Sequence, residues 1–347
     1  MTLRRLRTVD GFIAFDFDDA AVSAGGTRLA PDVSERETQL LARAMTYKFA
    51  ILGRRTGGAK GAIRGTSDQK PELMRRYCVE ILPLVRSMTF LTGADLGTSY
   101  DDFAPLRNPA DPPHAMGSDV GGVPLEDLVT GYGVIVGAEA AAGPIEGMSL
   151  ALEGFGKVGG GVAREAVRRG ANIVAVSTIE GCVYDPSGLD VELLFQLRES
   201  HGDAFVRHAR AETRDDPSSL FDVEADILVP GARTGVITGR VAERLRVRWI
   251  VPAANVPYAA SAVHVLAKRG IRYLPDFVCN AGATIGFVCG ADTAATILQE
   301  VDRTVASVMG EAAVDPAGPY AGACRIAERF LATWREPDAM PDGPPLG

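Results

Sequence analysis

Two lysines, Lys48 and Lys60, have the surroundings in this sequence that best suit a residue to chemistry. Lys60 lies in the run GGAKGA at positions 57–62, where almost no side chain would hinder a substrate or another backbone segment. A lysine buried in such a place loses hydration, its pKa falls, and a neutral amine becomes available as a base near neutral pH. We therefore predict that Lys60 is a catalytic base and that Lys48 is a fixed cation for a carboxylate. The alternative is that both are solvated lysines of a helix and a loop, on either side of a turn of small residues.

Asp95 is a third residue suited to chemistry, because it follows an expected strand and lies in a turn. Residues 88–91 are expected to form that strand, and Gly93 and Gly97 flank the aspartate. A carboxylate at a strand end is a frequent place for a site residue. The alternative is an aspartate that caps the next segment of the turn.

The helix expected to position Lys48 begins at Ser34. Ser34 and Glu37 form a capping box, which predicts a helix start. Lys48 follows Ala44 by four residues and Leu41 by seven, so it shares the otherwise apolar face of the helix and is expected to point into a cleft. The other elements expected near it are two strands and a helix, at residues 11–17, 21–28 and 69–86.

A second domain is predicted from a glycine-rich turn between two expected strands. The turn GFGKVG at 154–159 follows a strand at 148–152 and opens a helix that ends near Gly170, and a second strand follows at 172–176. Strand, glycine turn, helix and strand within about 30 residues are typical of a dinucleotide-binding unit. The glycines allow a pyrophosphate to approach the helix N-terminus. We predict a nicotinamide or flavin dinucleotide here.

Ser177 and Thr178 occupy the end of the second strand, where an acidic residue would bind the adenosine ribose 2′-hydroxyl and repel a 2′-phosphate. Neither side chain binds the 2′-hydroxyl strongly or repels a 2′-phosphate strongly. Glu180 follows two residues later, and the sequence leaves open whether its side chain reaches the ribose. The sequence therefore leaves both NAD and NADP as cofactors.

The rest of the second domain is expected to complete a parallel doubly wound sheet. Strands at 225–230, 248–251 and 271–274 alternate with helices, which is the pattern of such a sheet. Ligands bind at the carboxyl ends of its strands, where Asn255 and Asn280 lie. Their amides suit the carboxamide and ribose of a nicotinamide nucleotide, although both could instead cap loops. Two more helical stretches are expected, at residues 281–309 and 318–334.

The composition argues against several classes of function. The 347 residues carry a net charge of −8, which disfavours nucleic acid and anionic membranes as main partners. No apolar run approaches the ~18–20 residues of a membrane span. Five dispersed cysteines, without a CxxC pair or a His/Cys cluster, predict free thiols in the cytoplasm and no metal site. Residues 105–124, dense in proline and glycine, are expected to be a linker or mobile loop, and 336–347 a loose tail.

Over residues 11–335 the chain resembles the glutamate/leucine/phenylalanine/valine dehydrogenases. The first domain is most similar to leucine and phenylalanine dehydrogenases, through GGTR at 25–28 and LARAMTYK at 41–48. The second is more similar to glutamate dehydrogenases, through GFGKVG at 154–159, YDPSGLD at 184–190 and NAG at 280–282.

The resemblance implies a two-domain α/β fold with the active-site cleft between the domains. A substrate-binding and oligomerisation domain would span residues 1–127, completed by a C-terminal helix at about 312–347. A Rossmann-type NAD(P)-binding domain would span residues 128–311. The implied assembly is a homo-oligomer, a dimer or higher.

The resemblance also implies roles for the residues singled out above. Lys48 matches the lysine that pairs with the substrate α-carboxylate. Lys60 matches the lysine that activates water and stabilises the carbinolamine, and Asp95 matches the aspartate that moves protons to and from the amine. The implied reaction is NAD(P)-dependent oxidative deamination of an L-amino acid to the 2-oxo acid and ammonia, or its reverse. The residues implied in cofactor binding are Gly154, Phe155, Gly156, Lys157, Val158, Gly159, Ser177, Thr178, Thr130, Asn255 and Asn280.

Ala24, Gly25 and Gly26 are the implied substrate-binding residues that bear on specificity. Glutamate dehydrogenases carry a lysine at the position of Ala24 that binds the side-chain carboxylate, whereas leucine-type enzymes carry an apolar residue. Without that cation, burying a γ-carboxylate is costly, so we expect an apolar or aromatic amino acid as substrate. One alternative is glutamate. Another is a non-catalytic, dinucleotide-binding regulatory homologue, which the presence of Lys60 and Asp95 disfavours.

Overall fold

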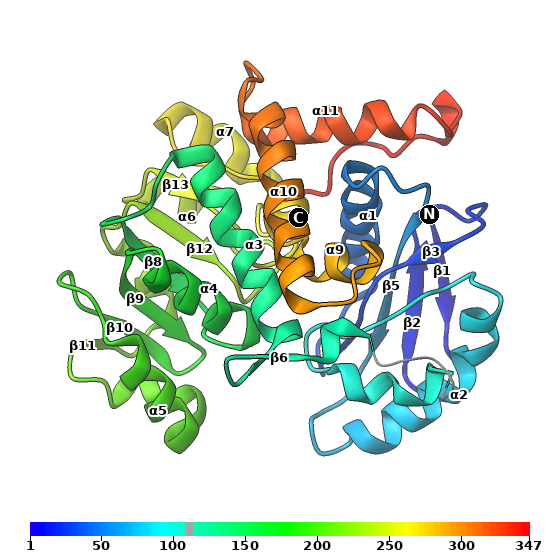
Figure 1. The fold of residues 1–347 in the computed structure, drawn as a ribbon, viewed down its shortest axis with the longest axis horizontal. Coiled ribbons are helices and arrows are strands. Elements are labelled where there is room, and N and C mark those ends of the chain that lie inside the picture. The colour runs from blue at the N-terminus through cyan, green and yellow to red at the C-terminus, as the bar shows by residue number, and fades with distance from the viewer. Residues whose placement is uncertain (109–113) are drawn as a thin grey trace. The chain divides into compact units, whose positions relative to one another are not determined.

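The computed structural model describes residues 1–108 and 114–347, and the chain divides into two compact units. Unit 1 comprises Met1–His114 and Cys324–Pro345, and unit 2 comprises Ala115–Ala323 and Leu346–Gly347. Each unit combines a β-sheet with helices (Figure 1), so the expected two-domain α/β fold is confirmed. The finer domain limits inferred from the sequence stay predictions.

The sheet of unit 1 is organised around one central strand, β5. The strand order is β1-β2-β5-β3, and β4 also pairs with β5. Strand β2 is antiparallel to β5, whereas β3 and β4 are parallel to it. The strands are β1 (Thr2–Arg5), β2 (Gly11–Phe15), β3 (Ser23–Ala24), β4 (Thr27–Leu29) and β5 (Gly57–Ile63).

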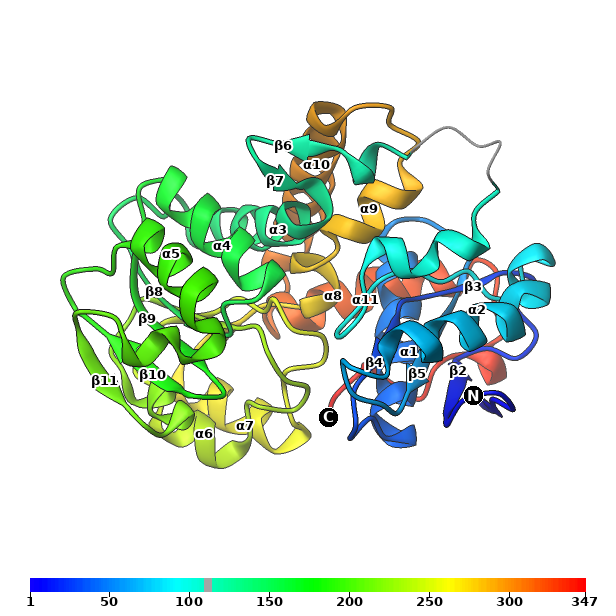
Figure 2. The ribbon, with the colours of Figure 1, turned by 90° about the horizontal axis from the view of Figure 1, so that it is seen from below.

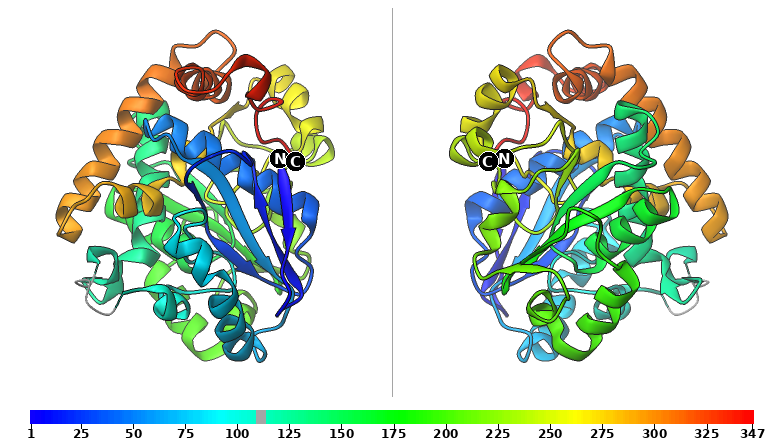
Figure 3. Two further views of the ribbon diagram at one scale, coloured as in Figure 1. Left: turned by 90° about the vertical axis from the view of Figure 1, so that its right-hand side faces the viewer. Right: turned by 90° about the vertical axis from the view of Figure 1, so that its left-hand side faces the viewer.

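Strand β5 contains the glycine-rich run that surrounds Lys60, so the run is not itself part of a turn. The strand needs small residues because helices α1 (Glu35–Ile51) and α2 (Lys70–Arg86) cover its two faces. A Cβ at Gly58 would collide with the α1 backbone at Ala42, and one at Gly61 would collide with the Tyr77 hydroxyl of α2. Figure 3 shows α1 lying along the blue strands of this sheet.

The two predicted helices of unit 1 are confirmed. Ser34 caps α1 by accepting a hydrogen bond from the Glu37 amide at 3.2 Å. Helix α2 buries Met74, Tyr77 and Ile81 against the sheet.

Two strand predictions in unit 1 are wrong in detail. The stretch 21–28 is split into β3 and β4, because Gly25 and Gly26 interrupt the pairing with β5. Residues 88–91 form no regular strand. Met88 turns the chain with a φ of 62°, after which the segment bonds to residues 23–25 through a few backbone hydrogen bonds and one isolated bridge, between Ala24 and Leu91.

Unit 2 contains a sheet in the order β11-β10-β9-β8-β12-β13-β14. The five strands from β9 to β14 are parallel, as predicted, and the chain leaves β8 in opposite directions, toward β9 and later toward β12. The C-terminal end of β8 is therefore the switch point at which such sheets bind ligands. The strands are β8 (Ser149–Glu153), β9 (Asn172–Thr178), β10 (Gly181–Tyr184), β11 (Glu212–Arg214), β12 (Ile227–Pro230), β13 (Trp249–Ile250) and β14 (Arg272–Tyr273).

One edge of this sheet departs from the purely parallel expectation. Strands β10 and β11 are antiparallel to their neighbours, since the turn between Thr178 and Gly181 is too short for a crossover helix. A short 3₁₀ helix, Gly202–Arg207, packs beside β9 and β10.

Helices cover the sheet of unit 2 (Figures 1 and 2). Helix α4 (Lys157–Arg168) follows the glycine turn, and α3 (Leu125–Ala142) packs closely on it. The stretch predicted at 281–309 is two helices, α9 (Gly282–Val288) and α10 (Ala294–Ala313), because Gly290 breaks it with a φ of 68°. The remaining helices are α5 (Val191–His201), α6 (Gly239–Arg244), α7 (Ala260–Arg269), α8 (Asp276–Cys279) and α11 (Pro319–Leu331), the last of which crosses the boundary of the two units.

Two expected loose segments have defined contacts. In the predicted linker 105–124, residues 109–113 lie outside the described residues, and the hairpin of β6 (Asp119–Val120) and β7 (Val123–Pro124) precedes α3. In the C-terminal tail, the Gly343 carbonyl accepts a hydrogen bond from Arg43 at 3.0 Å.

Candidate functional site

Lys60 projects from the middle of β5 into the interior of unit 1. Only 3% of the residue is exposed. The alternation of the strand places Lys60 on the same face as Gly58 and Ala62, which is the face that α1 covers. The alternative that Lys60 is a solvated loop lysine is therefore wrong.

Gly25 and Gly26 allow the chain to pass close to both Lys60 and Asp95. A Cβ at Gly25 would overlap the Ala59 carbonyl, next to Lys60, and a Cβ at Gly26 would lie 2.9 Å from the Cβ of Asp95. The Gly26 carbonyl accepts a hydrogen bond from the Gly61 amide at 3.1 Å. The two glycines thus determine how closely these segments approach, and any larger residue would separate them.

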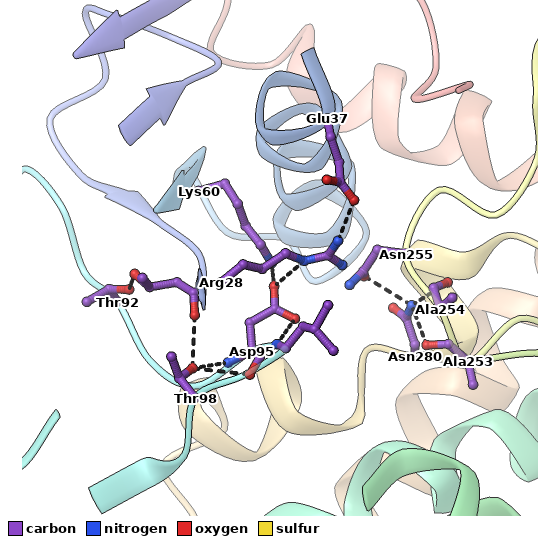
Figure 4. A network of polar contacts seen from close by, with 12 residues as sticks. Arg28, Glu37, Lys60, Thr92, Asp95, Thr98, Ala253, Ala254, Asn255 and Asn280 are labelled. Atoms are coloured by element: carbon purple, nitrogen blue, oxygen red, sulfur yellow. Dashed lines mark hydrogen bonds and ion pairs between the residues drawn. The ribbon is translucent and has the colours of Figure 1, made fainter. Parts of the chain in front are cut away.

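Lys60 and Asp95 form a buried ion pair that is extended by a second cation (Figure 4). Arg28 Nε donates to Asp95 Oδ2 at 3.2 Å, and Arg28 Nη1 donates to Glu37 Oε1 at 2.7 Å. The Asp95 loop is itself held by Thr98, whose hydroxyl accepts from the Asp95 amide at 2.9 Å and donates to the Thr27 carbonyl at 2.9 Å. The result is a fixed array of two cations and two carboxylates.

The pKa values of the central pair are shifted by burial and by their neighbours. Burial lowers the pKa of Lys60, and the Arg28 cation lowers it further, against the opposing effect of Asp95. Burial alone would raise the pKa of Asp95, but Lys60 and Arg28 outweigh burial and hold that pKa well below its usual range. Asp95 is therefore an ionised acceptor, and Lys60 releases its proton more readily than an exposed lysine does.

Sequence reasoning missed Arg28 and Glu37 as members of this site. Arg28 belongs to the motif GGTR at 25–28, and Glu37 belongs to the capping box of α1, so neither pattern by itself indicates a site residue. The available signal was a charged residue two positions after the glycine pair, in the short stretch TRL at 27–29. The pairing itself joins two elements, β4 and α1, and no local pattern identifies it.

Lys48 and Ala24 also lie in unit 1, where the sequence predicted substrate contacts. Lys48 is buried, with 5% of its surface exposed, in the last turn of α1. Ala24 is half-buried on β3 and pairs with Gly58, two residues before Lys60 on the neighbouring strand. Their roles toward a substrate stay predictions.

The glycine turn of unit 2 has the shape that a dinucleotide pyrophosphate requires. Gly154 has a φ of 89°, a conformation that favours glycine, and a Cβ at Gly159 would collide with the Gly154 carbonyl. A Cβ at Gly156, at the N-terminus of α4, would meet open space. The helix amides therefore face an accessible volume in which an anion is favoured, so these residues fit the cofactor.

Three other residues of this turn differ in how they can contribute. Phe155 is buried, and its ring packs 4.8 Å from that of Phe195, so only its backbone is available to a ligand. The Lys157 ammonium pairs with Asp127 at 2.9 Å, which ties the start of α4 to α3. Val158 is half-buried in the first turn of α4.

The end of β9 lies directly beside the glycine turn. The Gly154 amide donates to the Ser177 carbonyl at 2.9 Å, and Ser177 itself is buried. The Thr178 hydroxyl donates to the Asp203 carbonyl at 2.8 Å and accepts from the Glu180 amide at 3.1 Å. Thr178 therefore braces the turn that follows β9.

Asn255 and Asn280 lie together at the carboxyl end of the sheet of unit 2 (Figure 4). Asn280 Nδ2 lies 3.1 Å from Asn255 Oδ1 and also donates to the Ala254 carbonyl at 3.1 Å. Val256, the residue after Asn255, has a φ of 49°, and its amide donates to Asp276 Oδ2 at 2.8 Å. Buried Asp276 therefore supports the strained backbone that presents Asn255.

Thr130 reaches the same region from α3. A Cβ at Gly282 would collide with the Val129 carbonyl and come within 3.0 Å of the Thr130 backbone. This close packing brings Thr130 next to the start of α9, two residues after Asn280. The predicted role of Thr130 near the nicotinamide stays a prediction.

Clusters of metal-binding side chains and helices able to span a membrane are both absent from the residues that the structure describes. Residues 1–108 and 114–347 hold no group of three or more His, Cys, Asp or Glu side chains arranged to bind a metal. Within the same residues, no helix is both long and apolar enough to cross a bilayer.

Comparison with known proteins agrees with the fold and the glycine turn. A model of the glutamate/leucine/phenylalanine/valine dehydrogenases matches residues 121–312, and a model of the dimerisation domain of Glu/Leu/Phe/Val dehydrogenases matches residues 2–108. Glutamate dehydrogenase A2 of Halobacterium salinarum is 35% identical over 280 residues, which cover 75% of this chain and 67% of that protein. The NAD-specific glutamate dehydrogenase of Staphylococcus aureus (strain COL) is 32% identical over 295 residues, covering 80% and 70%.

Solved structures of the same kind superpose on this chain. The hetero-hexameric glutamate dehydrogenase from Thermus thermophilus in its leucine-bound form has a TM-score of 0.76 and 26% identity, covering 92% of this chain and 83% of its own. The L-tryptophan dehydrogenase of Nostoc punctiforme shares the fold, with a TM-score of 0.62 and 23% identity over 96% and 97% of the two chains.

The fold and the glycine turn define a dinucleotide-binding protein. The family matches then identify which kind: the chain belongs to the glutamate/leucine/phenylalanine/valine dehydrogenase family and is an oxidoreductase that acts on CH–NH2 groups.

Proposed function

We propose that this protein catalyses the reversible oxidative deamination of L-glutamate. Amino-acid dehydrogenase activity follows from the family, and the choice of glutamate is supported by relatives at 32–35% identity that are named glutamate dehydrogenases. The observation that carries the chemistry is the buried Lys60–Asp95 pair, because a depressed lysine pKa beside an ionised carboxylate suits proton transfer near neutral pH.

In this proposal each residue of unit 1 has one task. Lys48 binds the substrate α-carboxylate. Lys60, as the neutral amine, accepts a proton from the water that adds to the imine carbon and then stabilises the carbinolamine. Asp95 carries protons to and from the substrate nitrogen, so that ammonia leaves and the 2-oxo acid remains. Bound NAD(P) supplies the hydride acceptor, and the glycine turn of unit 2 with Asn255 and Asn280 would hold it.

An apolar or aromatic amino acid is the second candidate substrate, and Ala24 favours it. Ala24 supplies no cation for a γ-carboxylate at the position where the resemblance places a lysine in glutamate dehydrogenases. Arg28, the nearby cation of the array, is already paired with both Asp95 and Glu37. A glutamate-specific enzyme would therefore need a cation from another part of the pocket.

A panel of L-amino acids, assayed by the appearance of reduced cofactor with NAD and NADP in parallel, distinguishes these substrates. The proposal expects glutamate to have the highest kcat/KM. A higher kcat/KM for leucine, phenylalanine or tryptophan would replace glutamate by the second candidate, and no turnover of any amino acid would favour a regulatory homologue.

An Ala24→Lys variant sharpens the same test. If the wild-type pocket lacks a cation for the γ-carboxylate, the new lysine should raise kcat/KM for glutamate and lower it for apolar substrates. If the wild type already binds glutamate through another cation, the change should lower activity toward glutamate as well.

We also propose that the protein is a homo-oligomer, because residues 2–108 match a domain described as a dimerisation domain. Its location in the cytoplasm, inferred from cysteine usage, stays a prediction.

A further inference from the structure

The turn after β9 is contacted by a cation, Arg207, that has no part in the proposed dehydrogenase reaction. It joins β9 to β10 between Thr178 and Gly181, and it lies beside Gly154, whose amide binds the Ser177 carbonyl. In a dinucleotide-binding unit the end of this strand lies next to the adenosine ribose, where NAD carries a 2′-hydroxyl and NADP a 2′-phosphate. The residues of this turn therefore decide between the two cofactors.

Thr178 occupies the position at which a carboxylate would select NAD. Its hydroxyl makes two hydrogen bonds, one donated to the Asp203 carbonyl at 2.8 Å and one accepted from the Glu180 amide at 3.1 Å. Thr178 consequently places no negative charge against a 2′-phosphate. Its bonds also draw the segment that begins at Gly202 against the turn.

Arg207, from that segment, is fixed at the turn by the backbone. Its Nε donates to the Glu180 carbonyl at 2.9 Å, and its Nη2 pairs with Glu180 Oε2 at 3.1 Å. The hydrogen bond to the Glu180 carbonyl holds the guanidinium in place whether or not the Glu180 carboxylate is paired with it. The carboxylate is exchangeable, since the side chains of Arg207 and Glu180 are 52% and 37% exposed and such surface ion pairs contribute little to stability.

A 2′-phosphate is a stronger partner for this guanidinium than the Glu180 carboxylate. It carries more charge, and its oxygens match the fork of an arginine. Ile179, 80% exposed at the tip of the same turn, offers an apolar side chain to an adenine ring. The charges that oppose phosphate here are those of Glu180 and Asp203. When Arg207 binds the phosphate, the Glu180 carboxylate is released to solvent, which its 37% exposed side chain allows.

We propose that the protein binds NADP(H) in preference to NAD(H), with Arg207 exchanging the Glu180 carboxylate for the cofactor 2′-phosphate. The inference deepens the proposed function and rests on the nucleotide site of unit 2, but it does not depend on which amino acid is oxidised.

Direct binding of cofactor fragments to the full chain tests the proposal without turnover. In titration calorimetry with 2′,5′-ADP and 5′-AMP, the wild type should bind 2′,5′-ADP at least about tenfold more tightly, as for one added charge-assisted contact. Arg207→Ala should remove that difference and leave 5′-AMP affinity unchanged. Arg210→Ala, an exposed arginine of the same segment, is the matched control and should preserve the difference.

Two further variants test the turn from the opposite direction. Glu180→Gln should tighten 2′,5′-ADP, because the competing carboxylate is gone. Thr178→Asp should weaken 2′,5′-ADP and favour NADH over NADPH in a fluorescence titration. Equal or tighter binding of 5′-AMP by the wild type, or equal losses for both fragments in Arg207→Ala, would overturn the proposal. Binding of neither fragment would instead reject the nucleotide site, and with it the proposed dehydrogenase.

Discussion

At the scale of single residues, the catalytic proposal rests on the charges around Lys60. One buried lysine beside one aspartate would form a simple ion pair, in which each charge stabilises the other. Arg28 changes this balance, because it shares Asp95 with Lys60 and adds a positive charge next to the amine. Glu37, on α1, holds Arg28 in that position. The neutral form of Lys60 is thereby favoured without the loss of an ionised Asp95.

Lys60→Ala is expected to remove turnover while leaving cofactor binding intact. Loss of a positioned general base typically costs about 10²–10⁴-fold in rate. Steady-state kinetics and a fluorescence titration with reduced cofactor measure the two effects separately. Lys268→Ala, an exposed lysine of α7, serves as the control and should keep full activity. Substantial turnover by Lys60→Ala would remove the role assigned to this residue.

Arg28→Met is expected to move the pH profile of the enzyme toward alkaline pH. The Arg28 cation lowers the pKa of Lys60, so its removal raises that pKa, and the neutral amine is then populated only at higher pH. The acid limb of kcat/KM against pH should therefore shift upward. Arg75→Met, which removes an exposed arginine of α2 paired with Glu72, should leave the profile in place. An unchanged acid limb in Arg28→Met would show that this arginine has only a structural role.

At the scale of elements, the site depends on how closely three chain segments approach one another. Strand β5 has glycine on both faces, Gly58 toward α1 and Gly61 toward α2, so the two helices pack against it directly. Gly25 lies against the Ala59 carbonyl, which places the turn between β3 and β4 next to Lys60. The glycines of unit 1 thus set distances, whereas Gly154 in unit 2 supplies a backbone conformation.

Gly25→Ala is expected to destabilise the protein, and Gly310→Ala to stabilise it. The Cβ at position 25 collides with backbone that cannot move, at a cost of about 1–3 kcal/mol for such overpacking. Gly310 is exposed within α10, and its Cβ would meet open space, so alanine should add about 0.5–1 kcal/mol through helix propensity. Urea unfolding of both variants measures the difference. Equal stabilities would mean that β3 and β4 relax around the added methyl.

At the scale of the whole molecule, each unit carries part of the proposed site. Unit 1 holds the Lys60–Asp95 array, and unit 2 holds the glycine turn and the two asparagines. Unit 1 also ends its sheet in β1, whose outer edge has no partner strand among the described residues. An edge of this kind is available for pairing with another chain.

Light scattering on the purified protein is expected to give at least twice the 36.6 kDa chain mass. Deleting residues 1–5, which removes β1, should lower that mass to that of the single chain if pairing at this edge forms the dimer. An unchanged oligomer after the deletion would place the interface elsewhere, and a monomeric wild type would contradict the proposed homo-oligomer.

Much of this could be predicted because it depends on local patterns. The capping box of α1, the helix expected at 69–86 and the strand–glycine turn–helix unit at 149–168 need only neighbouring residues, and all three are present. The prediction of a strand at 88–91 was wrong in extent: its composition favours β-structure, but Met88 turns the chain with a φ of 62°, and only an isolated bridge at Leu91 and a few backbone hydrogen bonds follow. The preference for apolar substrates rested on Ala24 alone, and the relatives favour glutamate.

The sequence by itself determined the family and the cofactor class, and it singled out the lysine and aspartate on which the proposed chemistry depends, since each belongs to a short motif with a physical meaning. Tertiary structure decided what surrounds them. It buried Lys60 on the α1 side of β5 and connected Asp95 through Arg28 to Glu37, 58 residues earlier in the chain. It also placed Arg207 beside Glu180 at the end of β9. These contacts join segments that are distant in sequence, so they depend on packing and pairing that no local pattern encodes.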